Sequence, residues 1–297
     1  MITVAQIDSK FRSSYFRNLL ARSMRHAARK IGILDAPESH QSSAHWVISR
    51  YISVDGKDVL EIGGAQSGEA AHPFLNDGAA SVSITGLDHV TEEKFVSEKL
   101  RILRANALSL SSVFEPNSFD VVYGLSIVEH IPSPRAFLNE VHTVLKPGGV
   151  AFFEGNPIWS SPKGHHLWVA TWGGSYQHKA TANYLFNKFP GEKSTNPLPD
   201  WSHLLMTQDQ MRGHLDARGM PNVDIDCIID WVYFSDQINR LGMSEIAEAY
   251  STSKLIVLEA NTVRSRVPPD IESTLRKHCG DGVDYGTSGI SYVLAKR

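Results

Sequence analysis

The sequence predicts an α/β fold whose doubly wound, mostly parallel sheet is covered by helices on both faces. Short apolar segments typical of strands alternate along the chain with helical stretches, and the first strand, residues 57–62, breaks directly into Gly63 and Gly64. Parallel strands need helical crossovers, so this alternation favours a parallel sheet. The glycine turn would let a ligand lie against bare backbone at the end of the first strand.

The later elements follow from the same pattern. A helix is expected at residues 69–76, and a second strand at 82–88 that ends on Asp88. A carboxylate there, about 20 to 30 residues after the first turn, is placed to accept hydrogen bonds from a ribose. Further strands are expected at residues 100–108, 118–126, 150–154, 223–229, 254–260 and 290–295. Helices are expected at residues 134–145, 235–250 and from Thr207, an N-cap residue, to about Gly219.

This succession resembles the class I S-adenosyl-L-methionine-dependent methyltransferases, small-molecule enzymes with a type 11-like core. The resemblance covers residues 45–155 well and the remainder loosely. It implies a Rossmann-like methyltransferase fold with a seven-stranded sheet, an antiparallel final strand, and S-adenosyl-L-methionine as cofactor. The matching motifs are VLEIGG at residues 59–64, Asp88, NA at 106–107, FDVV at 119–122, VEHI at 128–131 and LKPGG at 145–149.

The resemblance also implies the residues that bind the cofactor. The turn of Glu61, Gly63, Gly64 and Ala65 would hold the methionine part, and Asp88 the ribose. Residues 124–126 would lie under the sulfonium. Asn106 and Ala107 would lie beside the adenine, and Ser126 is the residue of segment 124–126 assigned to the cofactor site.

The glycine turn departs from the family pattern of Glu-x-Gly-x-Gly-x-Gly. Ala65 and Ser67 replace two glycines, and Gly68 arrives one position late. Alanine tolerates positive φ poorly, so the path of this loop stays open. A dinucleotide-binding turn could use Gly63, Ala65 and Gly68, yet nothing downstream supports it. At Asn106 the family more often has an acid, although an amide oxygen can still accept from an adenine amino group.

Composition favours a cytoplasmic enzyme that acts on a small molecule. The chain has 297 residues, 42% of them hydrophobic, and a formal net charge of −3, which argues against a nucleic acid as main partner. Two cysteines, Cys227 and Cys279, fit a reducing compartment. No apolar run approaches the length of a membrane span, so no membrane partner is expected.

The chain divides into an N-terminal helical cap at residues 1–50 and a methyltransferase domain at 51–297. Within the cap, residues 10–30 are expected to form a basic amphipathic helix that packs on the domain and contributes to the substrate wall. A transit peptide and a surface that docks an acidic partner are the alternatives. The domain carries a lid insertion at 156–205 and a second insertion at 231–289. The second insertion would extend the substrate wall or form a homodimer contact.

The candidate catalytic residues are histidines. Transfer of a methyl group to a hydroxyl needs an aligned acceptor and removal of its proton, a task that histidine suits. His166 and His165 in the lid come first, followed by His203 and His130. Neighbouring residues on an extended loop point opposite ways, so at most one of the first two would face the methyl group. A divalent ion that acidifies the acceptor hydroxyl, as in some methyltransferases that act on sugars or catechols, is a competing idea. No spacing here matches a zinc or calcium motif, so no metal ligand is assigned and metal dependence stays open.

The sequence therefore predicts a methyltransferase that acts on a hydroxyl of a small polar metabolite or sugar. Aromatic side chains of the lid would stack on a sugar ring or a flat scaffold. N-methylation of a small molecule is the close alternative. A non-catalytic subunit that binds S-adenosyl-L-methionine is a further alternative, motivated by the altered glycine turn.

Overall fold

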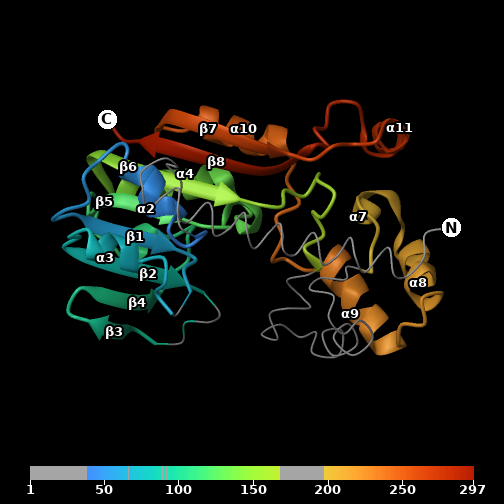
Figure 1. Ribbon diagram of the computed structural model, residues 1–297, viewed down its shortest axis with the longest axis horizontal. Helices are drawn as coiled ribbons and strands as arrows, with labels where there is room; N and C mark the ends of the chain where they lie inside the picture. The colour runs from blue at the N-terminus through green and yellow to red at the C-terminus, as the bar shows by residue number, and fades with distance from the viewer. Residues whose placement is uncertain (1–38, 66, 88–89, 91, 168–196) are drawn as a thin grey trace, which may run out of the picture.

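A computed structural model describes residues 39–65, 67–87, 90, 92–167 and 197–297 (Figure 1). The predicted basic helix at 10–30, Asp88 and the central part of the predicted lid lie outside these residues.

The described residues form one sheet of eight strands in the order β3-β4-β2-β1-β5-β6-β8-β7 (Figure 1). Strands β4, β2, β1, β5 and β6 pair in parallel, whereas β8 runs antiparallel to both β6 and β7. The predicted α/β class and the antiparallel final strand are thus confirmed. The strands are β1 (Asp58–Ile62), β2 (Ser81–Gly86), β3 (Lys94–Ser97), β4 (Leu100–Arg104), β5 (Phe119–Gly124), β6 (Leu145–Gly155), β7 (Ile256–Arg264) and β8 (Thr287–Ala295).

The observed sheet differs from the predicted one in two places. Residues 94–97 add an edge strand, β3, which pairs antiparallel with β4. Residues 223–229, predicted as a strand, lie instead in helix α9 (Asn222–Tyr233), and the place next to the final strand is taken by β7. The segment alternates Asp224 and Asp226 with apolar residues, but it also places Ile225, Ile228 and Val232 on one buried helical face, and that packing decides.

Helices cover both faces of the sheet, as expected for a doubly wound fold. Consecutive residues of β1 point to opposite faces: Val59 packs with α2 (Ser43–Ile48) and α3 (His72–Asn76), whereas Leu60 packs with α4 (Pro134–Val144) and α10 (Met243–Ser251). Burial of apolar side chains on both faces explains why the strands read as continuous apolar runs.

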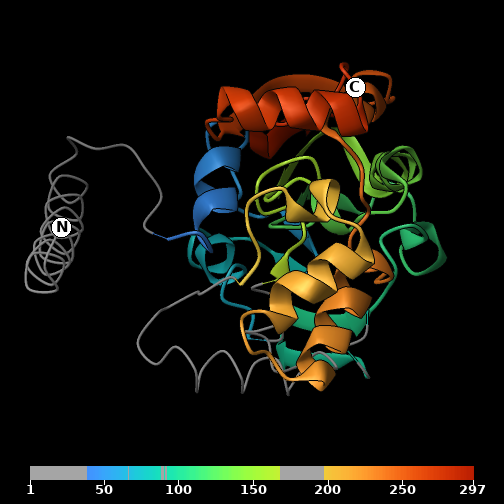
Figure 2. The ribbon, with the colours of Figure 1, turned by 90° about the vertical axis from the view of Figure 1, so that its right-hand side faces the viewer.

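A smaller group of helices lies off the carboxyl end of β6 (Figures 1 and 2). It contains α7 (Ser202–Leu205), α8 (Gln208–Asp216) and α9, and α8 and α9 pack through their own cluster of buried apolar residues. Thr207 caps α8 as predicted, because its side chain accepts from the backbone N–H of Gln210 in a capping box. A further helix, α11 (Pro269–Cys279), packs against α7.

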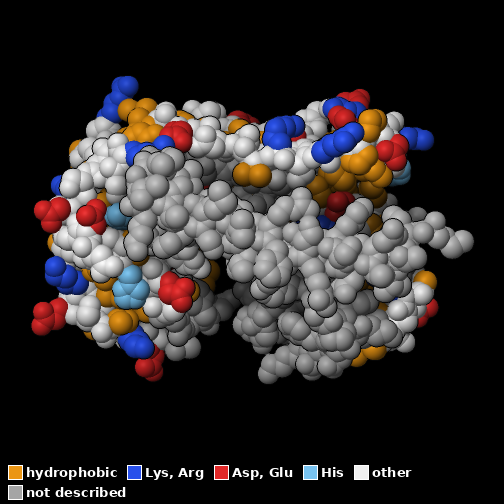
Figure 3. All heavy atoms as spheres, in the orientation of Figure 1, with side chains coloured by type: hydrophobic (Ala, Val, Ile, Leu, Met, Phe, Trp, Pro, Cys, Tyr) orange, Lys and Arg blue, Asp and Glu red, His pale blue; other side chains and the backbone are white. Residues whose placement is uncertain are grey.

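On the face drawn in Figure 3, described side chains of both charge signs are interspersed. None of the helices in this part of the chain is long and apolar enough to cross a bilayer.

Candidate active site

The turn after β1 packs closely against neighbouring side chains. Gly63 has a φ of 74°, and both Gly63 and Gly64 donate their N–H groups to Thr85 of β2. A Cβ on Gly64 would lie 2.4 Å from the Glu61 carboxyl and 2.6 Å from Ile84. The positive φ values of this turn fall on Gly63 and Gly68, not on Ala65, so the departures from the family pattern need no strained alanine.

Glu61 lies buried beneath the turn. Its side chain is only 4% exposed, and its Oε2 accepts a hydrogen bond from the hydroxyl of Tyr123 at 2.8 Å. Burial disfavours the ionised form and raises the pKa of Glu61 to about 7. A positively charged ligand above the turn would favour the carboxylate.

This pKa predicts a pH dependence of stability. Between its ordinary value of 4.5 and about 7, the folded protein binds more protons at Glu61 than the unfolded chain. The free energy of unfolding therefore falls as pH rises through this window, whereas a Glu61→Gln variant lacks this loss. From pH 5 to pH 8, the variant should gain about 2 to 3 kcal/mol relative to the wild type in urea unfolding. An equal pH dependence of the two proteins would refute the shift.

The other predicted cofactor residues lie at the same edge of the sheet. Asn106 is exposed two residues after β4, and its Oδ1 accepts from the backbone N–H of Leu108 at 2.9 Å, with Ala107 partly buried beside it. Ser126 is exposed after β5, with a φ of 49°. Asp88 follows β2 in the sequence but lies outside the described residues.

The short helix η2 (Val128–His130) follows β5 and carries two titratable side chains. Asn239 holds this turn from outside: its side-chain amide donates to the carbonyls of Val128 and Ile131, and its backbone N–H donates to that of Glu129. The His130 Nδ1 lies 2.6 Å from the carbonyl oxygen of Gln237. Because a carbonyl oxygen only accepts, Nδ1 carries the proton and Nε2 the lone pair.

Glu129 is buried at the centre of this region. Its Oε1 accepts from the backbone N–H of Asn156 at 3.1 Å, and burial raises the pKa of the carboxyl above its usual value. Its Oε2 has no hydrogen-bond partner among the described residues. The sequence analysis included Glu129 only as part of the VEHI motif and did not name it as a site residue. Its position directly before the candidate His130 was the signal that could have found it.

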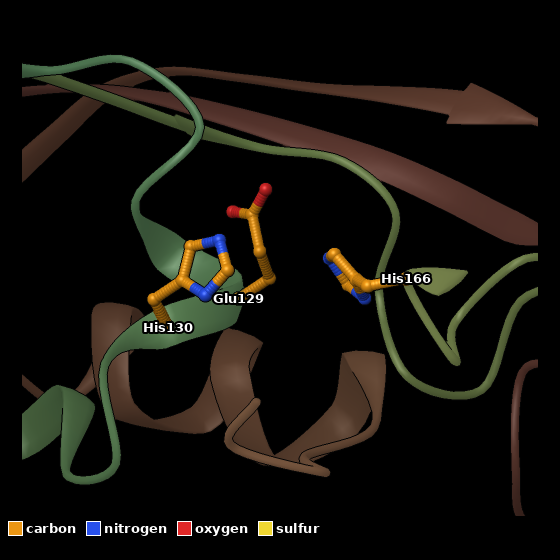
Figure 4. Close-up of side chains that lie close together, drawn as sticks. All are labelled: Glu129, His130 and His166. Carbon is orange, nitrogen blue, oxygen red and sulfur yellow. The ribbon is translucent and has the colours of Figure 1, made fainter. Parts of the chain in front are cut away.

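The four candidate histidines divide into two groups. His166 lies beside His130, with ring centroids 5.5 Å apart, and Figure 4 shows it converging on Glu129 and His130. His165 instead lies beside His203, at 5.4 Å, and the His203 Nε2 lies 2.7 Å from the carbonyl oxygen of Trp159. The neighbouring His165 and His166 thus face different groups.

Burial separates these histidines chemically. It lowers the pKa of His166 to about 3 and that of His203 to about 4, and it lowers the pKa of His165 well below its ordinary range. These three rings are neutral near pH 7 and poor proton acceptors. His130 is partly exposed, which gives an acceptor molecule access to it.

The segment just before α2 contacts the carboxyl edge of the sheet through His40. The Nε2 of His40, just before α2, pairs with the carboxylate of Glu154 near the end of β6, and this hydrogen bond raises the pKa of His40. A hollow of about 540 Å³ lies at the opposite edge of the sheet, where β1 and β2 begin at Asp58 and Ser81. That hollow is remote from the glycine turn and from η2.

The comparisons with known proteins concern the same part of the chain. Residues 60–153 match a family described as a methyltransferase domain. A ubiquinone biosynthesis O-methyltransferase of Azotobacter vinelandii is 30% identical over 128 residues, which cover 40% of this chain and 52% of that protein. A sterol 24-C-methyltransferase of Pneumocystis carinii is 30% identical over 103 residues, 32% of this chain and 27% of that protein. The chain spans about half or less of the length of these relatives.

Among solved structures, an S-adenosylmethionine-dependent methyltransferase from Mesorhizobium loti aligns with a TM-score of 0.47 and 15% identity, over 87% of this chain and 100% of that one. Residues 60–153 match a methyltransferase domain, and the described sheet and glycine turn have the arrangement expected of the class I S-adenosyl-L-methionine-dependent methyltransferases.

Proposed function

We propose that this protein transfers a methyl group from S-adenosyl-L-methionine to a hydroxyl oxygen of a small polar molecule. The observation that carries the proposal is the convergence of Glu129, His130 and His166 at the carboxyl edge of the sheet (Figure 4). Open α/β sheets bind their ligands at this edge. Titratable groups beside a cofactor turn favour chemistry that moves a proton.

The glycine turn would hold the cofactor. Gly63 and Gly64 offer backbone without side chains, and Glu61 lies beneath them as a carboxyl that a positively charged cofactor would favour in its ionised form. The cofactor supplies a methyl group on a sulfonium, which is already a strong electrophile. The residues of the protein therefore have to align the acceptor, exclude water and take up a proton.

His130 is the favoured proton acceptor of the four candidate histidines. The hydrogen bond from its Nδ1 to Gln237 leaves the basic lone pair on Nε2, and the ring is partly exposed. The nearby Glu129 side chain would stabilise the imidazolium that forms. His166, His165 and His203 would then shape the site as neutral rings, because burial depresses their pKa values.

The similarity to ubiquinone biosynthesis O-methyltransferases supports an oxygen acceptor. The similarity to sterol 24-C-methyltransferases makes carbon methylation the second candidate. N-methylation and a binding-only role remain as the alternatives derived from the sequence. The insertions at 156–205 and 231–289 would form the acceptor pocket.

Two measurements test this function. Calorimetric titration should show S-adenosyl-L-methionine binding that an Asp88→Ala variant weakens about tenfold or more, while the matched control Asp216→Ala, an exposed residue at the end of α8, binds normally. Turnover with a methyl-labelled cofactor and a broad panel of phenols, sugars, amines and alkenes should place the label on oxygen. Label on carbon or nitrogen would overturn O-methylation, and binding without any product would favour a binding-only role.

A further inference from the structure

We propose that Glu129, His130 and His166 form a binding site for a divalent first-row transition-metal ion. The ligand atoms that the three side chains can offer all lie within 4.8 Å of one another (Figure 4). Two imidazoles and one carboxylate suit Zn²⁺, Fe²⁺, Co²⁺ and related ions. The sequence left metal dependence open and assigned no ligands, because positions 129–130 and 166 are far apart in the chain and match no spacing motif.

Both imidazoles are held in the form that a metal requires. The His130 Nδ1 donates to the carbonyl of Gln237 at 2.6 Å, and the His166 Nδ1 donates to that of Gly164 at 2.7 Å. Each bond fixes the proton on Nδ1 and so places the lone pair on Nε2. Histidines that bind metals typically donate their other N–H to a carbonyl or carboxylate in this way.

Glu129 supplies the negative charge and an oxygen that needs a partner. Its side chain is 2% exposed, its Oε1 is held by the backbone N–H of Asn156, and its Oε2 has no hydrogen-bond partner in the described part of the chain. A buried oxygen without a partner is costly, and a cation would satisfy it. A Cβ on Gly155 would lie 2.6 Å from Oε2, so a glycine at this position leaves room for the carboxylate.

The supporting backbone is already in place. Three hydrogen bonds from Asn239 fix η2, and His166 takes a φ of 53°, a conformation that a non-glycine residue keeps only when its surroundings impose it. Bonds of about 2.0 to 2.2 Å separate neighbouring ligand atoms by roughly 3 to 3.5 Å. Small side-chain rotations would close the site to that size.

Three protein ligands leave further coordination positions for water or an acceptor oxygen. If the proposed hydroxyl methylation is correct, the ion would acidify the hydroxyl bound to it. The ion would then replace the free His130 imidazole in this task. Metal binding itself does not depend on that function.

The test is binding of Zn²⁺ and Co²⁺ to the full-length protein after treatment with a chelator. We expect one equivalent of Zn²⁺ by calorimetry, and a visible Co²⁺ absorption band from a site with nitrogen and oxygen ligands. Glu129→Gln and His166→Asn should each weaken binding by about 100-fold or more, since each removes one of three ligands. Asparagine at position 166 can keep both the left-handed backbone and the hydrogen bond to Gly164.

The matched control is His278→Asn, which removes an exposed imidazole whose Nδ1 likewise donates to a backbone carbonyl, that of Thr274. This variant should bind the metal as the wild type does. No binding to the wild type, or equal binding by the wild type and the Glu129 and His166 variants, would overturn the site. Circular dichroism of each variant confirms that it is folded. Because the readout is metal binding, the site can fail while methyl transfer stands, and the reverse.

Discussion

Replacement of Gly64 by alanine should weaken binding of S-adenosyl-L-methionine by at least about tenfold and lower the melting temperature by about 5 °C. The new Cβ would lie 2.4 Å from the carboxyl of Glu61 and 2.6 Å from Ile84. Both neighbours are buried, so the turn itself has to move. Overpacking of this kind costs about 1 to 3 kcal/mol, and each kcal/mol shifts the melting temperature of a protein of this size by about 2 to 4 °C.

The matched control for this variant is Gly213→Ala in α8. A Cβ at Gly213 meets no atom within 4 Å, and alanine favours a helix over glycine. This control should bind the cofactor normally and melt at an equal or slightly higher temperature. Calorimetry and thermal unfolding measure both effects. A Gly64→Ala protein that binds and melts as the wild type does would refute the close packing of Gly64 against Glu61 and Ile84.

A His130→Asn variant should lose about 10²- to 10⁴-fold in kcat and bind S-adenosyl-L-methionine within about twofold of the wild type. The asparagine amide can replace Nδ1–H in the hydrogen bond to Gln237, but it has no group in the place of Nε2. The variant therefore removes the proton acceptor, or the metal ligand, and preserves the clamp on η2. Single-turnover kinetics with the best acceptor from the panel measure the loss.

His278→Asn is again the control, since it makes the same replacement at an exposed ring whose Nδ1 donates to Thr274. A complementary His130→Gln variant places an amide near Nε2 but loses the bond to Gln237. If His130→Asn retains normal turnover, His130 only supports the fold, and the proton is removed elsewhere. If both the cofactor affinity and turnover fall together, the loss reflects the structure of η2 rather than its chemistry.

Much of the fold could be predicted because its strands and turns are encoded locally. Residues 57–64 end an apolar strand on two glycines, and the structure places β1 and a turn with a positive φ there. The helix capped by Thr207 was likewise predicted from one polar side chain at its start. Residues 223–229 were assigned wrongly because their apolar positions fit both periods, and only packing against α8 selects the helix.

The candidate site shows the same division. The sequence by itself determined the glycine turn, Glu61 and His130, since each depends on residues close together in the chain, whereas Glu129 was noted only as part of a motif. Only the tertiary structure decided which lid histidine joins them: the path after β6 brings His166 to η2 and turns His165 toward His203. It also decided the burial that lowers the pKa values of these rings. Both depend on contacts between distant segments, such as Asn239 with η2, which no local pattern encodes.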